Sequence, residues 1–212
     1  MLTVLIDYES GNLHSAEKAF QRMAVEADAG QVIVSDRAED VARADRLVLP
    51  GDGAFPACAR ALKGRENLFD ALREAVEDRG RPFLGICVGM QLMARLGHEY
   101  ERTEGLGWID GEVDRIAPDD LALKVPHMGW NDLVIDRPHP VLAGIETGHH
   151  ADFVHSYHMR MTDKNQLLAH AEYGAPITTV VGRDTMVGTQ FHPEKSQAAG
   201  LRLIANFLAW RP

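Results

Sequence analysis

The sequence predicts an α/β protein built on a mostly parallel sheet, because short apolar segments alternate with helical patterns through its first half. Four apolar runs have the length of buried strands, at residues 2–6, 32–34, 47–49 and 83–86. Segments with helical spacing of apolar residues lie between them. A β-α-β-α order of this kind places parallel strands side by side, with helices on both faces of the sheet.

The helices are recognised by apolar residues that recur every three or four positions. In the first helix these are Leu13, Ala16, Phe20, Met23 and Ala27. Asn12 precedes this helix at the position of an N-cap. A second helix is expected around Phe69–Val76, ending before Gly80, and a third just after Cys87, over 90–96.

The second half of the chain predicts further strands in antiparallel or mixed pairing. They are expected at residues 107–116, 132–135, 152–157, 178–182 and 186–191. A last helix begins near Gln197, with Ser196 as its cap. No internal repeat, low-complexity segment or long linker interrupts the chain, so residues 1–212 are expected to form a single domain.

Composition excludes several classes of function. The 212 residues are 45% hydrophobic and 25% charged, with a formal net charge of −9 and a pI of about 5.5, which argues against a nucleic-acid partner. The start of the chain has no basic segment typical of a signal peptide, and no apolar run is long enough to span a membrane. Two cysteines do not make a disulfide framework, so a cytoplasmic protein with reduced thiols and no membrane partner is expected.

The segment Gly85-Ile86-Cys87-Val88-Gly89 predicts a nucleophile. It joins an apolar strand to a helix and is the cysteine version of the G-x-S-x-G elbow, in which a tight turn presents the side chain at the top of a sheet. The helix N-terminus favours a thiolate there. An isolated cysteine is more often a small buried apolar residue, which is the interpretation we prefer for Cys58. The flanking glycines favour the nucleophile at Cys87.

A base for this cysteine is expected at the end of a later strand, in the run Phe191-His192-Pro193-Glu194. A thiol nucleophile needs a group that accepts its proton and a third group that orients the base. His192 suits the first role and Glu194 the second. Alone, the tripeptide His192-Pro193-Glu194 is a weak signal and would favour a strand-ending turn with a surface histidine and a solvated glutamate.

Other histidines do not predict a metal centre. His149 and His150 are adjacent, and on an extended strand adjacent side chains point to opposite faces. No cysteine or carboxylate completes a ligand spacing typical of zinc. His127, His155 and His158 are expected to bind substrate or to pack.

The run Pro50-Gly51-Asp52-Gly53 follows a third strand and is a candidate oxyanion loop. Acyl transfer needs two N–H donors directed at the tetrahedral oxyanion. In elbow enzymes one donor belongs to the residue after the nucleophile, here Val88, and the other to a loop after a neighbouring strand. The run could also be a simple turn, and it lacks the signatures of a nucleotide-phosphate loop.

Together, PGDG at 50–53, GICVGMQ at 85–91 and FHPE at 191–194 resemble the class I glutamine amidotransferases. The resemblance spans nearly the whole chain and implies a flavodoxin-like sheet, with additional antiparallel or mixed strands in the second half. It implies L-glutamine as the substrate, with Cys87, His192 and Glu194 as the catalytic triad. Val88 and the Gly51–Asp52 peptide are implied as oxyanion donors. No cofactor or metal is implied.

The same resemblance implies how the substrate and a partner bind. Gln91 and the segment Ser156-Tyr157-His158 hold glutamine. Tyr8, Asn12 and the 126–131 loop, with Trp130 prominent, face the partner. This partner is a (β/α)₈-barrel synthase subunit that consumes the ammonia.

DYESGN at 7–12, KVPHMGWN at 124–131 and the lack of a fused synthase favour the histidine-biosynthetic branch over guanylate, anthranilate and carbamoyl phosphate relatives. The chain departs from the family at Glu9, where glycine is usual, and at Asp52, where a small apolar residue is usual. Alternatives are the glutaminase subunit of another synthase, such as that of pyridoxal phosphate synthesis, a γ-glutamyl hydrolase, or a non-enzymatic flavodoxin-like module.

Overall fold

The computed structural model describes residues 1–9, 11–120 and 122–212 of the chain. Its largest sheet has eight strands in the order β2-β1-β3-β4-β14-β13-β12-β9. In that order their bounds are Gln31–Ser35, Leu2–Ile6, Arg46–Gly51, Phe83–Cys87, Met186–Thr189, Pro176–Arg183, Leu167–Glu172 and Val134–Ile135. The strands from β2 to β14 pair in parallel, and the remaining three pair antiparallel. The predicted fold class is therefore confirmed.

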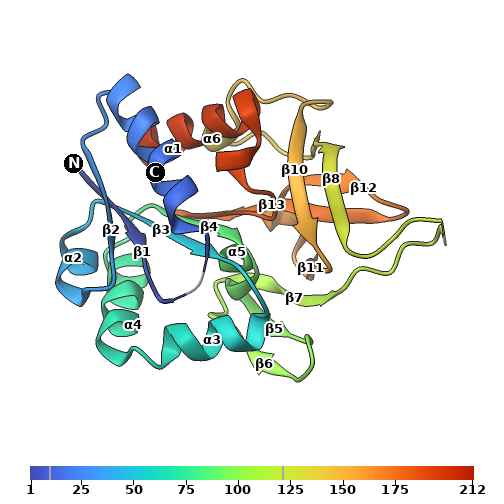
Figure 1. Cartoon of the computed structure of the whole chain (residues 1–212), viewed down its shortest axis with the longest axis horizontal. Coiled ribbons are helices and arrows are strands. Elements are labelled where there is room, and N and C mark those ends of the chain that lie inside the picture. The colour runs from blue at the N-terminus through green and yellow to red at the C-terminus, as the bar shows by residue number, and fades with distance from the viewer. Residues whose placement is uncertain (10, 121) are drawn as a thin grey trace.

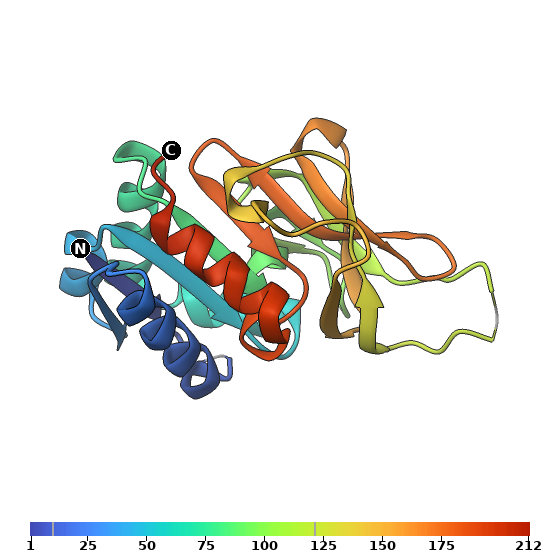
Figure 2. The same cartoon turned by 90° about the horizontal axis from the view of Figure 1, so that it is seen from above.

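Helices cover both faces of the parallel part of this sheet (Figure 1). On one face α1 (Leu13–Glu26) and α6 (Gln197–Ala209) lie side by side, as Figure 2 shows. On the other lie α2 (Ala38–Arg43), α3 (Phe55–Lys63) and α4 (Glu66–Arg73), the last continuing into a π-helical turn at Glu74–Asp78. Strands enclosed on both faces bury nearly every side chain, which explains the continuous apolar runs in the sequence. In the described part of the chain, no helix is long and apolar enough to cross a bilayer.

Two smaller sheets extend to one side of the helix-covered part (Figure 2). One has the strand order β11-β7-β5-β6, with bounds Tyr157–Met161, Ile109–Arg115, Ala94–Gly97 and Thr103–Glu104. The other is a two-stranded ribbon of β8 (His127–Asp132) and β10 (His150–His155). Short 3₁₀ turns lie at Pro140–Leu142, Lys164–Gln166 and Pro193–Lys195.

The prediction of a helix over 90–96 is wrong in its second half. Helix α5 (Val88–Leu92) ends early, and β5 follows. Ala94 and Leu96 are buried while Arg95 between them is exposed, which is the alternation of a strand. Pairing with β7 decides the outcome, because tertiary contacts override a short helical pattern.

Two further predictions need correction. The 126–131 segment is largely strand β8 rather than a loop, because it pairs along its length with β10. The strand expected over 152–157 is divided between β10 and β11 at Ser156. Helix α2 and strand β12 are additional elements that the apolar spacing did not predict.

Asn12 and Ser196 do precede their helices, but neither side chain caps one. The Ser196 hydroxyl instead donates to the His192 carbonyl at 2.7 Å and accepts the Asp152 N–H at 3.0 Å. Ser196 therefore joins the start of α6 to strand β10 and to the segment that carries His192.

Candidate active site

The three predicted strand ends meet at one edge of the sheet. Strands β3, β4 and β14 are neighbours and run parallel, so their carboxyl ends coincide. Gly51 lies directly beside Cys87 in the register, and Thr189 lies beside Ile86. The sheet thereby brings the 50–53 loop and the 190–194 segment to either side of the cysteine.

Cys87 occupies a strained elbow between β4 and α5. Its backbone angles are φ 54° and ψ −113°, which non-glycine residues rarely adopt. The flanking glycines permit the turn because there is no space for side chains: a Cβ on Gly85 would lie 2.6 Å from the Gly89 carbonyl oxygen, and one on Gly89 would overlap the Leu49 carbonyl oxygen. Cys87 therefore lies in a tight turn between strand and helix, and its role as the nucleophile stays a prediction.

His192 and Glu194 lie together beside the elbow. The His192 Nδ1 atom is 2.9 Å from Glu194 Oε1, and the two side chains are only 6% and 3% exposed. Pro193 between them begins a 3₁₀ turn that brings the carboxylate back to the ring. A buried, oriented imidazole and carboxylate next to a thiol is the arrangement that activates a nucleophile.

The electrostatics of this group favour a protonated imidazole. Burial lowers the pKa of His192, but hydrogen bonds to the Cys87 sulfur and to Glu194, together with their negative charges, raise it to about 10. The imidazolium is therefore the stable form of His192 at neutral pH.

The residues expected to bind an oxyanion surround the sulfur. Val88 is the first residue of α5, so its N–H has no partner within the helix. Gly51 packs so tightly that a Cβ there would lie 2.5 Å from the Gly89 nitrogen. The Asp52 carbonyl accepts a hydrogen bond from the Cys58 thiol at 3.4 Å, so Cys58 packs as expected and also fixes this loop.

A cavity of about 290 Å³ opens beside Cys87. Gln91, Ser156 and Tyr157 line it, so their predicted role at the substrate has a place in the structure and stays a prediction. His158 does not, because alternate residues of a strand point to opposite faces. It lines a separate cavity with Arg160 instead, so the expectation that it holds glutamine does not fit its position.

Sequence reasoning missed two residues of this site. Glu99 is buried at the cavity wall, where one carboxylate oxygen accepts the Phe55 N–H at the start of α3 at 2.8 Å. Gln190 is fully buried, with its Nε2 atom 3.7 Å from the Cys87 sulfur. Glu99 belongs to a polar stretch with no motif, whereas Gln190 adjoins the FHPE motif and could have been suspected from that.

The expected partner residues differ in exposure. Trp130 is 49% exposed and Asn12 is exposed, so both can be reached by another chain. Tyr8 is fully buried, and its hydroxyl lies 2.8 Å from where a Cβ on Gly51 would stand. The expectation that the Tyr8 side chain faces a partner is therefore wrong, because it packs beneath the 50–53 loop.

No group of three or more histidine, cysteine, aspartate or glutamate side chains is placed to hold a metal ion, as far as residues 1–9, 11–120 and 122–212 show. A thiol, a charged imidazole and an orienting carboxylate beside the N-terminus of a helix are the groups that acyl transfer by a cysteine enzyme uses.

Comparison with known proteins agrees with that class. Residues 4–210 match the Glutamine amidotransferase class-I family. The chain is 73% identical over 212 residues to the imidazole glycerol phosphate synthase subunit HisH of Cereibacter sphaeroides and 70% identical to that of Ruegeria pomeroyi, with full coverage of both chains in each case. A solved glutamine amidotransferase shares 19% identity with a TM-score of 0.74 over 97% of each chain, which shows a common fold.

The chain therefore belongs to the class I glutamine amidotransferases, within their family of HisH subunits. The segments DYESGN and KVPHMGWN predict this histidine-biosynthetic branch from the sequence alone, and the relatives confirm the prediction.

The raised pKa of His192 predicts an unusual titration. The ring should stay protonated through neutral pH and lose its proton only near pH 10. Because the folded value exceeds the unfolded value of about 6.5, the stability gained from this charge should be complete below pH 6.5 and be lost as the pH rises through 10. NMR of the ring nitrogens, assigned with a His192→Asn variant, measures this. Cys87→Ala and Glu194→Gln should each lower the midpoint, and a wild-type midpoint near 6.5 would contradict the ion pair.

Proposed function

We propose that this chain is the glutaminase subunit of an imidazole glycerol phosphate synthase and acts as one domain. It hydrolyses L-glutamine to L-glutamate and ammonia. It delivers the ammonia to a (β/α)₈-barrel subunit that makes imidazole glycerol phosphate and aminoimidazole carboxamide ribotide. The observation that carries the proposal is the left-handed Cys87 elbow beside the buried His192–Glu194 pair. The assignment to this synthase rests on the name of a relative that is 73% identical to the chain.

The chemistry follows from these positions. The Cys87 thiolate attacks the side-chain amide carbon of glutamine. The oxygen of the tetrahedral intermediate then accepts hydrogen bonds from the N–H groups of Val88 and the Gly51–Asp52 peptide. His192 gives its proton to the departing nitrogen, which leaves as ammonia, and a thioester remains. Water then attacks the thioester while His192 accepts its proton, which releases glutamate and restores the thiolate.

The cavity walls offer suitable groups for the amino-acid part of glutamine. Both amide N–H groups of Gln91 are used within the protein, by the Tyr157 carbonyl and by Gln190 Oε1, each at 3.0 Å. Its oxygen is therefore the atom that it can offer to an N–H group of the substrate. The Glu99 carboxylate supplies negative charge for the α-ammonium group.

The β8–β10 ribbon has the character of a docking face. Met128 lies opposite Val154 and is two residues from Trp130, so the three side chains share one face of the ribbon. All three are exposed, at 67%, 42% and 49% respectively. Large exposed apolar groups gathered in this way are typical of protein interfaces. Val154 also lines the Cys87 cavity, so a partner on this face would cover the exit through which ammonia leaves.

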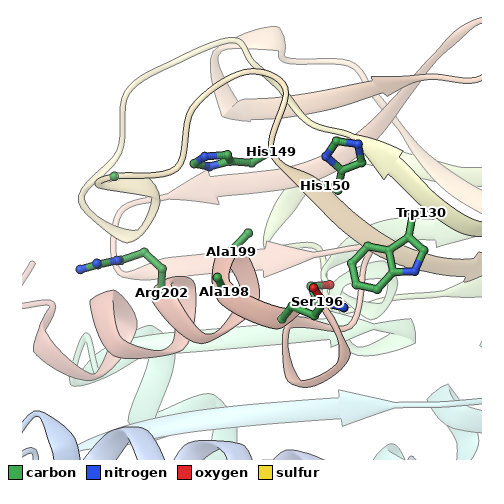
Figure 3. A pocket seen from close by; sticks show the side chains of 9 residues that line it. Trp130, His149, His150, Ser196, Ala198, Ala199 and Arg202 are labelled. Carbon is green, nitrogen blue, oxygen red and sulfur yellow. The ribbon is translucent and has the colours of Figure 1, made fainter.

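A neighbouring groove extends this face. It encloses about 560 Å³ between the ribbon and the start of α6, with Trp130 and Arg202 at its two ends and His149 and His150 along one wall (Figure 3). Trp130 therefore has space beside it for a side chain from the partner. A cytoplasmic location is part of this proposal, since a reducing compartment keeps the Cys87 thiol out of disulfides.

The Cys87→Ala substitution separates the glutaminase from the synthase. It removes only the sulfur, so the elbow and the partner complex should persist. Glutamine-dependent product formation should fall to background, by about 10⁶-fold for loss of the nucleophile of a catalytic unit. Synthesis from ammonium salt with the barrel partner should continue, because that route bypasses the thioester. Retained glutamine turnover would exclude Cys87 as the nucleophile, and loss of both activities with an intact complex would reject the division of labour.

The Trp130→Ala substitution tests the docking face. We expect partner affinity to fall by about tenfold or more, because exposed aromatic anchors contribute about 1–4 kcal/mol at interfaces. The melting temperature of the isolated chain should be unchanged, since half of the side chain is already exposed. Val25→Ala, at an 82% exposed position on α1, is the matched control and should bind normally. Titration calorimetry measures the affinity of each protein for the barrel subunit. Equal affinities of wild type, Trp130→Ala and Val25→Ala would exclude Trp130 from the interface.

A further inference from the structure

The Cys87 sulfur has a polar neighbour other than His192. Gln190 Nε2 lies 3.7 Å from it, within the range of an N–H···S hydrogen bond. Gln190 is fully buried and does not line the cavity beside the cysteine. It therefore contacts the reacting atom from within the protein, where the substrate does not reach.

The direction of the Gln190 amide is set by its partners. Gln91 donates one N–H to the Tyr157 carbonyl and the other to Gln190 Oε1, each at 3.0 Å. Because Gln190 Oε1 accepts this bond, its amide nitrogen is the end that faces the sulfur. A donor rather than an acceptor is thus held against Cys87.

The network continues behind Tyr157 through two neutral histidines. The Tyr157 carbonyl also accepts from His155 Nδ1 at 2.8 Å, so His155 Nε2 must accept from His127 Nδ1, 3.0 Å away. Asn131 then donates to the remaining His127 nitrogen at 3.1 Å. Burial lowers the pKa of His155 to about 3 and that of His127 to about 4, which keeps both rings neutral and the bond directions fixed.

We propose that Gln190 is a further catalytic residue, whose buried amide N–H stabilises the Cys87 thiolate. A hydrogen bond to the charged form of a group favours that form. A buried amide that is already oriented needs no reorganisation when the thiolate forms or returns. The part of the proposal that concerns glutamine turnover rests on the proposed function, whereas the effect on the thiol does not.

The test compares Gln190→Met with wild type. Methionine has a similar volume and no N–H donor, so packing is retained while the bond to sulfur is lost, together with the Oε1 acceptor for Gln91. The control is Thr179→Val, which removes a buried hydroxyl from the strand that pairs with β14 without touching Cys87. Alkylation of Cys87 by iodoacetamide, followed across pH by mass spectrometry of the Cys87 peptide, reports the thiolate without any glutamine. Among the described residues, the other titratable groups around the sulfur or its cavity are His192, Glu194, Asp52, Glu99, His155 and Tyr157, and they are unchanged in both variants.

We expect Gln190→Met to move the midpoint of the alkylation profile upward by about one pH unit and to lower kcat for glutamine by about tenfold. KM should stay within about twofold, because Gln190 does not contact the substrate and Gln91 keeps its other bond, to the Tyr157 carbonyl. Thr179→Val should match wild type in all three measurements. An unshifted midpoint in Gln190→Met, or a higher KM with normal kcat, would overturn the proposal.

A replacement variant and a comparison of the two assays keep the outcome decisive. If Gln190→Met fails to fold, Gln190→Glu replaces it, and its carboxylate beside the thiolate should shift the midpoint further upward. A wild-type midpoint in that variant would also overturn the proposal. If no protein hydrolyses glutamine while the Gln190→Met midpoint still shifts, the proposed function fails and the role of Gln190 stands.

Discussion

The whole site depends on one close approach between backbones, where α5 begins beside the end of β3. Gly89 packs against the Leu49 carbonyl at a distance that no side chain permits, and Gly51 and Gly85 pack against Gly89 in turn. This packing lets α5 start at the residue after Cys87, which forces the cysteine into its left-handed conformation. Such a conformation costs about 1–3 kcal/mol of free energy. The packing of the buried strands β3 and β4 offsets this cost.

The elbow positions the sulfur, and the residues around it supply the rest of the chemistry. The segment after β14 brings His192 to the sulfur as a charged partner, and Ser196 fixes that segment to strand β10 through hydrogen bonds to His192 and Asp152. The ribbon that carries β10 has two distinct faces. Its inner face stacks His127 on Phe153 at 4.7 Å between ring centres, and its outer face exposes Trp130. The surface suited to a partner and the catalytic segment therefore share one structural unit.

Much of the fold and of the candidate site could be predicted, because the functional residues at the strand ends lie in short local motifs. A few neighbouring residues suffice to predict the turn at Cys87, from its flanking glycines, and the pairing of His192 with Glu194. What the sequence could not show depends on distant contacts: the side of the strand on which His158 points, the burial of Tyr8 beneath a loop, and the approach of Glu99 to the cavity. The departure at Glu9 is also explained only in three dimensions. Its φ of 68° favours glycine, and its carboxylate binds Arg65 at 2.7 Å instead.

The most direct measurement is labelling of the complete complex with a diazo-ketone analogue of glutamine, with the barrel subunit and its ligand present. Mass spectrometry locates the label, and glutamine turnover is followed in the same samples. The account predicts one label per chain, on Cys87, with turnover lost in proportion and protection by excess glutamine. A turnover that is lost while Cys87 stays unmodified, or that continues after Cys87 is fully labelled, would contradict it.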